Sequence, residues 1–168
     1  MRVDLVTPHL PELAVLLAEP VATSWSDALD QGHRLSAKTG TIVLVKGGHL
    51  NGDACPDALV DDRRLPNSHW VSTNSAGTGS AAGTRAVFEV AGDRVRTSNT
   101  HGTGCSMSSA IATLQARYDD WPRALTETKA WLTDALRSSG ELHVGRGNGP
   151  INHFHSLWQR AAASSSQL

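Results

Sequence analysis

A threonine between two glycines, followed directly by a cysteine, is the stretch of this sequence best suited to chemistry: Gly102-Thr103-Gly104-Cys105. A β-rich segment leads into it and a helical pattern leaves it. Glycines let the backbone turn tightly and approach a ligand. The first amides of a helix lack partners within the helix and carry the positive end of its dipole. The pattern therefore predicts an anion site, most often a phosphate site, with Cys105 on its rim.

A second Gly-Thr-Gly, Gly77-Thr78-Gly79, provides an internal comparison. It leads into residues 85–90, which alternate between apolar and polar side chains as a strand does. No helix amides would be available there, so residues 75–84 are predicted to form a flexible surface loop.

Two further positions have two interpretations each. Lys46 and Gly47 follow the apolar run of residues 41–45. A lysine before glycines at a strand end can reach a phosphate, or it can mark a solvated strand end with a glycine turn. Glu12 falls in the first turn of an expected helix, where it complements the helix dipole. Alternatively, it reaches a metal at the carboxyl end of the preceding strand, where open α/β sheets bind ligands.

The elements that must position these residues alternate along the chain. The apolar run 41–45 is typical of a strand buried on both faces of a parallel sheet. Helical spacing of apolar residues predicts helices at 10–17, from Ser24 or Ser26 to about 38, after Cys105, from Trp121 to Gly140, and at 151–160. Short β-like pieces are expected at 3–6, 58–60 and 69–71, with a hairpin formed by 85–90 and 94–97. The pattern predicts one α/β domain over residues 1–163 and a disordered tail at 164–168.

Composition excludes several classes of protein. The formal net charge of −1 gives no broad electrostatic footprint for nucleic acid or an anionic membrane. No apolar run is long enough to span a bilayer, and the N-terminus lacks the apolar core of a signal peptide. The two cysteines do not form a disulfide framework, and the histidines show no zinc-type spacing with them. A reducing cytoplasm is therefore expected, and there Cys105 keeps a free thiol.

Five segments, in order, resemble one family, the hydroxymethylpyrimidine/phosphomethylpyrimidine kinases of thiamine biosynthesis. They are Val6-Thr7-Pro8-His9-Leu10-Pro11-Glu12, Val43-Leu44-Val45-Lys46-Gly47-Gly48-His49, Thr100-His101-Gly102-Thr103-Gly104-Cys105 with Ser108-Ser109-Ala110-Ile111, residues 124–136 with Lys129-Ala130-Trp131-Leu132, and Gly149-Pro150-Ile151-Asn152-His153. The resemblance covers nearly the whole chain. It implies a ribokinase-like fold, a doubly wound, mostly parallel sheet flanked by helices.

The resemblance also implies roles for individual residues. The anion hole for the transferred phosphoryl group would consist of Gly102, Thr103, Gly104 and the amide of Cys105. The Cys105 thiolate would be the general base, a position that most of the superfamily fills with aspartate; a helix N-terminus favours thiolates. Glu12 would hold Mg²⁺, directly or through water. The remaining positions would contact ATP: Lys46, Gly47, Thr100, His101 and Lys129, with residues 97–101 bordering the nucleotide.

Two departures from the family pattern affect these expectations. His9 stands where the family has asparagine, and an imidazole differs from an amide in shape and can gain charge. The family also has further strands and helices before its Thr-Pro-Asn segment, and they carry most pyrimidine contacts. The resemblance thus describes an N-terminally truncated kinase with an open strand edge, which a second copy or a partner chain would cover. The alternatives are an inactive or ATP-binding remnant and a kinase for a pyridoxal-type alcohol.

Overall fold

The computed structural model describes residues 3–62 and 86–158. The expected β-like piece at 69–71, the predicted loop at 75–84 and the predicted tail at 164–168 lie outside the described residues. The chain divides into two compact units, Met1–Arg94 and Val95–Leu168, and each is described by itself. The expectation of a single domain over 1–163 stays a prediction.

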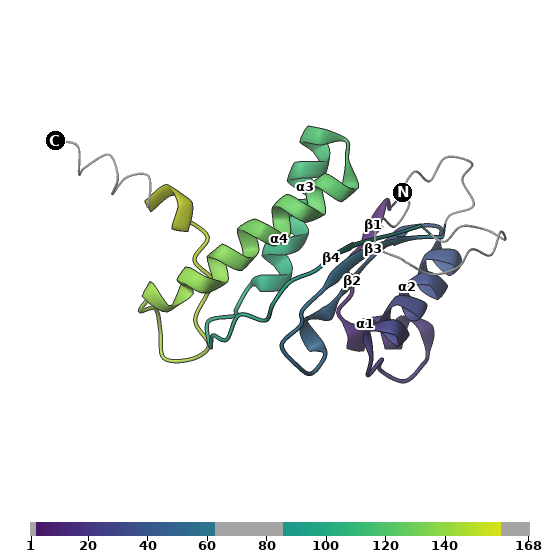
Figure 1. The fold of residues 1–168 in the computed structure, drawn as a ribbon, viewed down its shortest axis with the longest axis horizontal. Helices are drawn as coiled ribbons and strands as arrows, with labels where there is room; N and C mark the ends of the chain where they lie inside the picture. The colour runs from purple at the N-terminus through teal and green to yellow at the C-terminus, as the bar shows by residue number, and fades with distance from the viewer. Residues whose placement is uncertain (1–2, 63–85, 159–168) are drawn as a thin grey trace. The chain divides into compact units, whose positions relative to one another are not determined.

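The first unit is built on a four-stranded sheet in the order β1 (Leu5–Val6), β2 (Ile42–Lys46), β3 (Asp57–Asp61) and β4 (Ala86–Val90) (Figure 1). β1 and β2 are parallel, whereas β2–β3 and β3–β4 are antiparallel. The strands predicted at 3–6, 41–45, 58–60 and 85–90 are confirmed, but the described sheet is mixed and not mostly parallel. The connection from β2 to β3 holds only the 3₁₀ turn Gly47–His49, too little for the crossover that parallel neighbours need.

Helices α1 (Leu10–Leu17) and α2 (Trp25–Thr39) pack beside this sheet (Figure 1). α2 approaches so closely that a Cβ on Gly32 would lie 2.5 Å from the Val45 side chain. Both predicted helices are confirmed, and so is Ser24 as the N-cap of α2. α1 buries Leu10, Leu13 and Ala14, whereas Leu16 is 51% exposed.

The predicted return strand at 94–97 is wrong. Arg94 instead anchors the loop after β2: its guanidinium donates to the carbonyl oxygens of Gly48, Leu50 and Gly52, at 2.9, 2.5 and 2.8 Å. Its backbone N–H donates to Asp53 O, at 2.7 Å. Because these bonds hold Arg94 against the loop after β2, residues 94–97 do not form a hairpin strand with β4.

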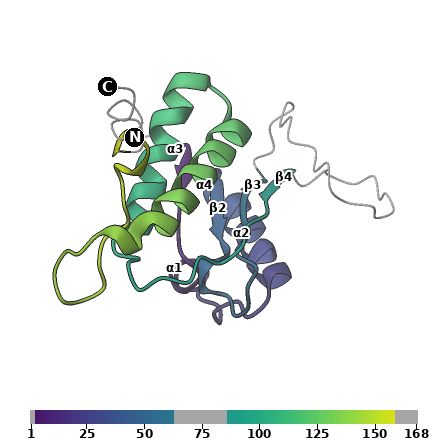
Figure 2. The same cartoon turned by 60° about the vertical axis from the view of Figure 1, so that its left-hand side comes forward.

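The second unit contains α3 (Thr103–Tyr118), α4 (Trp121–Arg137) and the 3₁₀ turn Ser138–Glu141; Figure 2 shows the two helices side by side. Both predicted helices are confirmed, although α4 ends at Arg137 and not at Gly140. The predicted helix at 151–160 is shorter: described residues 155–158 are helical, whereas Ile151 and Asn152 are buried and non-helical. Ile151 N donates to His101 O and Asn152 N to Ala135 O, so these amides hold the segment to other elements.

Among residues 3–62 and 86–158, no helix combines the length and apolar character needed to cross a membrane.

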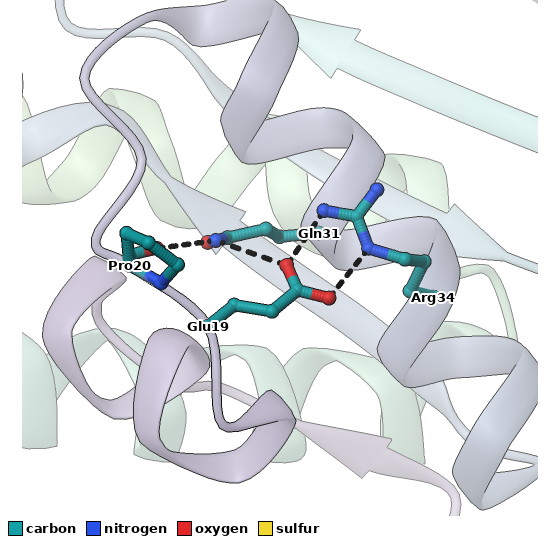
Figure 3. Close-up of polar contacts among 4 residues, drawn as sticks. All are labelled: Glu19, Pro20, Gln31 and Arg34. Carbon is teal, nitrogen blue, oxygen red and sulfur yellow. Dashed lines mark hydrogen bonds and ion pairs between the residues drawn. The ribbon is translucent and has the colours of Figure 1, made fainter.

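The turn between α1 and α2 is held by the polar network of Figure 3. Glu19 accepts two hydrogen bonds from Arg34, at 2.9 and 2.7 Å, and one from Gln31 Nε2, at 3.4 Å. Gln31 Nε2 also donates to Pro20 O, at 2.7 Å. The bonds from Arg34 lower the pKa of Glu19, and its charge adds to this effect, while desolvation opposes it. Two residues of α2 thereby fix the chain as it leaves α1.

Arg34→Met should lower the unfolding midpoint at neutral pH, because Glu19 loses its main partner. A carboxylate whose pKa is lower in the folded state stabilises above its ordinary value of 4.5 and loses that contribution as the pH falls. The difference in unfolding midpoint between wild type and variant should therefore become smaller in acid. Urea unfolding at several pH values measures this, with Glu19→Gln as the control that cannot titrate. A gap that stays constant down to acid pH would contradict the assignment.

Candidate functional site

The first turn of α3 leaves two backbone donors without acceptors in the part of the chain that the structure describes. Gly102, the N-cap, has φ 84° and ψ 0°, a left-handed conformation that favours glycine. Thr103 N donates to Thr100 O at 3.3 Å, and Ser106 N closes the first helical bond to Gly102 O at 2.9 Å. Between them, the N–H groups of Gly104 and Cys105 have no acceptor among the described residues. We call these two amides the cradle.

The N-termini of α1, α2 and α4 are closed by side chains. His9 caps α1, Ser24 caps α2 and Asp120 caps α4, each accepting an amide of the first turn. α3 has no side-chain cap. Its first turn therefore keeps both the donors and the positive end of the dipole available to an anion.

Cys105 lies beside the cradle and is exposed, with a free thiol. It lines a groove of about 620 Å³ within the second unit, together with residues from α3, α4 and the C-terminal segment. Gly104 is open as well: a Cβ there would meet nothing within 4 Å. A ligand can therefore approach the cradle amides and the thiol together, as the sequence predicts for Gly102 to Cys105.

The loop before the cradle is held by groups that the sequence analysis did not single out. Asn99 accepts from Gly149 N at 3.2 Å and donates to Ser139 O at 2.7 Å. His101 N donates to Gly149 O at 3.0 Å. The Asn99 side chain fills the space that a Cβ on Gly149 would need. The sequence could have indicated both residues, because Asn99 lies just before the Gly102–Cys105 motif and Gly149 begins the C-terminal segment that resembles the family.

In the first unit, Lys46 ends β2 and Gly47 follows it in the 3₁₀ turn. Gly47 is buried, and its N–H donates to Pro56 O at 2.8 Å and to Asp57 Oδ1 at 3.3 Å. A Cβ on Gly47 would collide with the backbone of Pro56. Close packing against Pro56 thus explains why residue 47 is a glycine. Its N–H group already has acceptors within the protein.

Glu12 forms a capping box with His9. His9 N donates to Glu12 Oε2 at 2.9 Å, and Glu12 N donates to His9 Nδ1 at 3.0 Å. The His9 N–H bond lowers the pKa of Glu12, and the charges of His9, Lys46 and His49 act in the same direction against desolvation. The His49 ring, 5.0 Å from the His9 ring, has a pKa lowered by burial and by the charges of His9 and Lys46.

The Glu12 carboxylate is in contact with His9 through both of its oxygens. The second oxygen of Glu12 lies 3.2 Å from His9 Nε2, so both carboxylate oxygens already contact His9. Within the described residues, no group of three or more histidine, cysteine, aspartate or glutamate side chains is placed to hold a metal ion. The capping box explains Glu12 in the described chain, and its role toward Mg²⁺ stays a prediction.

The predicted site residues thus form two groups. Thr100, His101, Gly102, Thr103, Gly104 and Cys105 form one continuous turn in the second unit, where Lys129 lies half-buried on α4. Glu12 and Lys46 lie near each other in the first unit, with Gly47 next to Lys46. The residues predicted to contact ATP are therefore divided between the two units.

The fold is the ribokinase-like α/β fold. Pyridoxal kinase of Bacillus subtilis, solved as an ADP complex, superposes with a TM-score of 0.71 and 20% sequence identity, covering 92% of this chain and 51% of that structure. This likeness confirms the predicted fold class.

The chain belongs to the phosphomethylpyrimidine kinase family, whose sequence profile matches residues 1–85 and 82–152. Hydroxymethylpyrimidine/phosphomethylpyrimidine kinase of Escherichia coli is 38% identical over 94% of this chain and 51% of that protein. Thiamine biosynthesis multifunctional protein ThiED of Corynebacterium efficiens is 40% identical over 90% of this chain and 18% of that protein. The chain spans about half the length of its Escherichia coli relative.

Two glycine substitutions separate the shape of the turn from its chemistry. Gly102→Ala places a Cβ on a left-handed residue and should destabilise the second unit by about 1–2 kcal/mol. Gly104→Ala meets no steric contact and improves helix propensity, so it should fold at least as well as the wild type. Its methyl group would nevertheless stand beside the cradle and weaken binding of ATP or inorganic pyrophosphate.

Chemical denaturation and calorimetric titration of both variants test this separation. Gly104→Ala that binds either anion as tightly as the wild type would contradict the cradle. A Gly102→Ala variant of unchanged stability would contradict the left-handed N-cap.

Proposed function

We propose that this chain provides the phosphoryl-transfer part of a kinase that phosphorylates hydroxymethylpyrimidine and its monophosphate with ATP in thiamine biosynthesis. One observation carries the proposal: α3 begins with two amides that have no acceptor among the described residues, and they lie beside the exposed thiol of Cys105. The proposed reaction is that of the family, because its members are named for this activity. The compartment we propose is the cytoplasm.

In the proposed reaction, the amides of Gly104 and Cys105 bind the oxygens of the phosphoryl group as it moves from ATP to the acceptor. Negative charge is spread over these oxygens during transfer, and donors already in place lower the barrier. The Cys105 thiolate removes the proton of the acceptor hydroxyl or phosphate. That oxygen forms the new bond to phosphorus as the bond to the leaving ADP breaks.

The remaining predicted contacts are with the nucleotide. Lys46 would approach the ATP phosphates, and Thr100, His101 and Lys129 would border the nucleotide. Gly102 and Thr103 shape the turn; the Thr103 hydroxyl and amide both donate to Thr100 O, at 2.6 and 3.3 Å. Mg²⁺ would neutralise phosphate charge during transfer, and we propose that Glu12 holds it, directly or through water.

Cys105→Ser tests the base. The serine hydroxyl does not ionise at neutral pH, so kcat should fall by about 10²–10⁴-fold while ATP binding persists. Steady-state phosphorylation of hydroxymethylpyrimidine and of its monophosphate measures the loss, and calorimetry measures ATP binding. Cys55→Ser is the matched control, because Cys55 is the other cysteine of the chain and lies outside the groove.

Three outcomes would change the proposal. Full turnover by Cys105→Ser would remove Cys105 as the base. ATP binding without turnover by the unsubstituted chain would favour a nucleotide-binding remnant. Faster transfer to pyridoxal than to hydroxymethylpyrimidine would assign the chain to the pyridoxal-type alternative.

We also propose that the surface beside β1 is covered by polypeptide equivalent to the N-terminal half of the relatives. β1 is an end strand of the described sheet and pairs with β2 alone. On the adjoining α1, Val15 is 80% exposed and Leu16 51% exposed. Both line a groove with Val6, Thr7, Pro8 and Pro11. An open strand edge beside apolar side chains is typical of a surface that another segment covers.

A hydrophobic-dye assay tests this surface. The chain alone should bind the dye, Leu16→Ser should bind less, and the separately expressed N-terminal half of the Escherichia coli relative should displace it. Sedimentation velocity distinguishes this complex from a homodimer. A monomer that binds no dye and does not associate with the N-terminal half would overturn the proposal.

A further inference from the structure

The C-terminal segment of residues 149–153, here called the strap, is bonded to both sides of the cradle. Before the cradle, His101 N donates to Gly149 O at 3.0 Å, and Ile151 N donates to His101 O at 3.4 Å. After the cradle, Ser106 Oγ lies 2.7 Å from His153 Nε2. Some 47 residues separate Ser106 from His153 along the chain, so this bond is a tertiary contact.

The strap is itself fixed to α4. Asn152 is buried, and its N–H donates to Ala135 O at 3.0 Å. The ring of His153 lies 6.2 Å from the ring of Trp131, which is also on α4 and lines the same groove as Cys105. His153 therefore approaches Ser106 from a segment that is held by α4.

Ser106 directly follows Cys105 and closes the first hydrogen bond of the helix, to Gly102 O. It is thus the residue whose position decides whether the first turn of α3 is formed. An uncapped helix end frays easily, because its first amides have no partners within the helix. A bond from the side chain of Ser106 to a fixed imidazole opposes fraying and leaves the amides of Gly104 and Cys105 unoccupied.

We infer that His153 is a positioning residue, which acts through Ser106 to hold the first turn of α3 and thereby the cradle and the Cys105 thiol. The inference rests on the proposed function of the cradle, but its consequence can be measured without turnover. A formed helix N-terminus stabilises a nearby thiolate. Loss of the Ser106–His153 bond should therefore lower the reactivity of Cys105.

The experiment measures alkylation of Cys105 by iodoacetamide in the whole chain, with Cys55→Ser as background so that one thiol remains. His153→Ala and Ser106→Ala should each slow alkylation at neutral pH by about two- to five-fold, the size of a helix-terminus effect. Alkylation of the double variant should be no slower than that of either single variant, because all three variants lose the same Ser106–His153 bond.

A conservative variant and a control distinguish positioning from general packing. In His153→Gln, the amide nitrogen takes the place of Nε2 and should restore the wild-type rate. His143→Ala removes an exposed histidine of the same unit and should change nothing. Unchanged alkylation in both Ser106→Ala and His153→Ala would overturn the inference, and so would a slow His153→Gln. Absence of kinase activity would instead count against the proposed function, because alkylation requires no substrate.

Discussion

The structure of the candidate site depends on one constraint: α3 must begin without a capping side chain. Unpaired backbone N–H groups are costly when buried, and proteins satisfy most of them. Here the two unpaired amides lie next to an exposed cysteine, where solvent or an anion can reach them. Gly102 makes this possible, because its left-handed conformation turns the chain into the helix without presenting a capping side chain.

The same chain closes another helix in the opposite way. At α1, His9 and Glu12 exchange two hydrogen bonds, so the first turn is satisfied from within. The capping box thus closes the N-terminus of α1. It also uses the Glu12 carboxylate, which the family resemblance assigns to a metal. The N-terminus of α3 is therefore available to a ligand because no side chain caps it, whereas that of α1 is closed by its own residues.

Local sequence predicted local structure well. The apolar run at 41–45 and the glycine turn before Cys105 depend on neighbours in sequence, and both are present. Long-range pairing was harder: Arg94 binds three carbonyl groups of the loop after β2, and alternation alone suggested a strand there. The roles of Asn99 and His153 were likewise missed, because their partners lie 40 or more residues away.

Gly102 and Gly104 look alike in the sequence, but the structure gives them different reasons for being glycine. Gly102 has a backbone conformation that other residues adopt only with strain. Gly104 is helical, and a methyl group would meet nothing within 4 Å. Alanine would also favour the helix there, so neither folding nor packing accounts for this glycine. The proposed role of the cradle would account for it, because a Cβ would obstruct the approach of a ligand to the backbone.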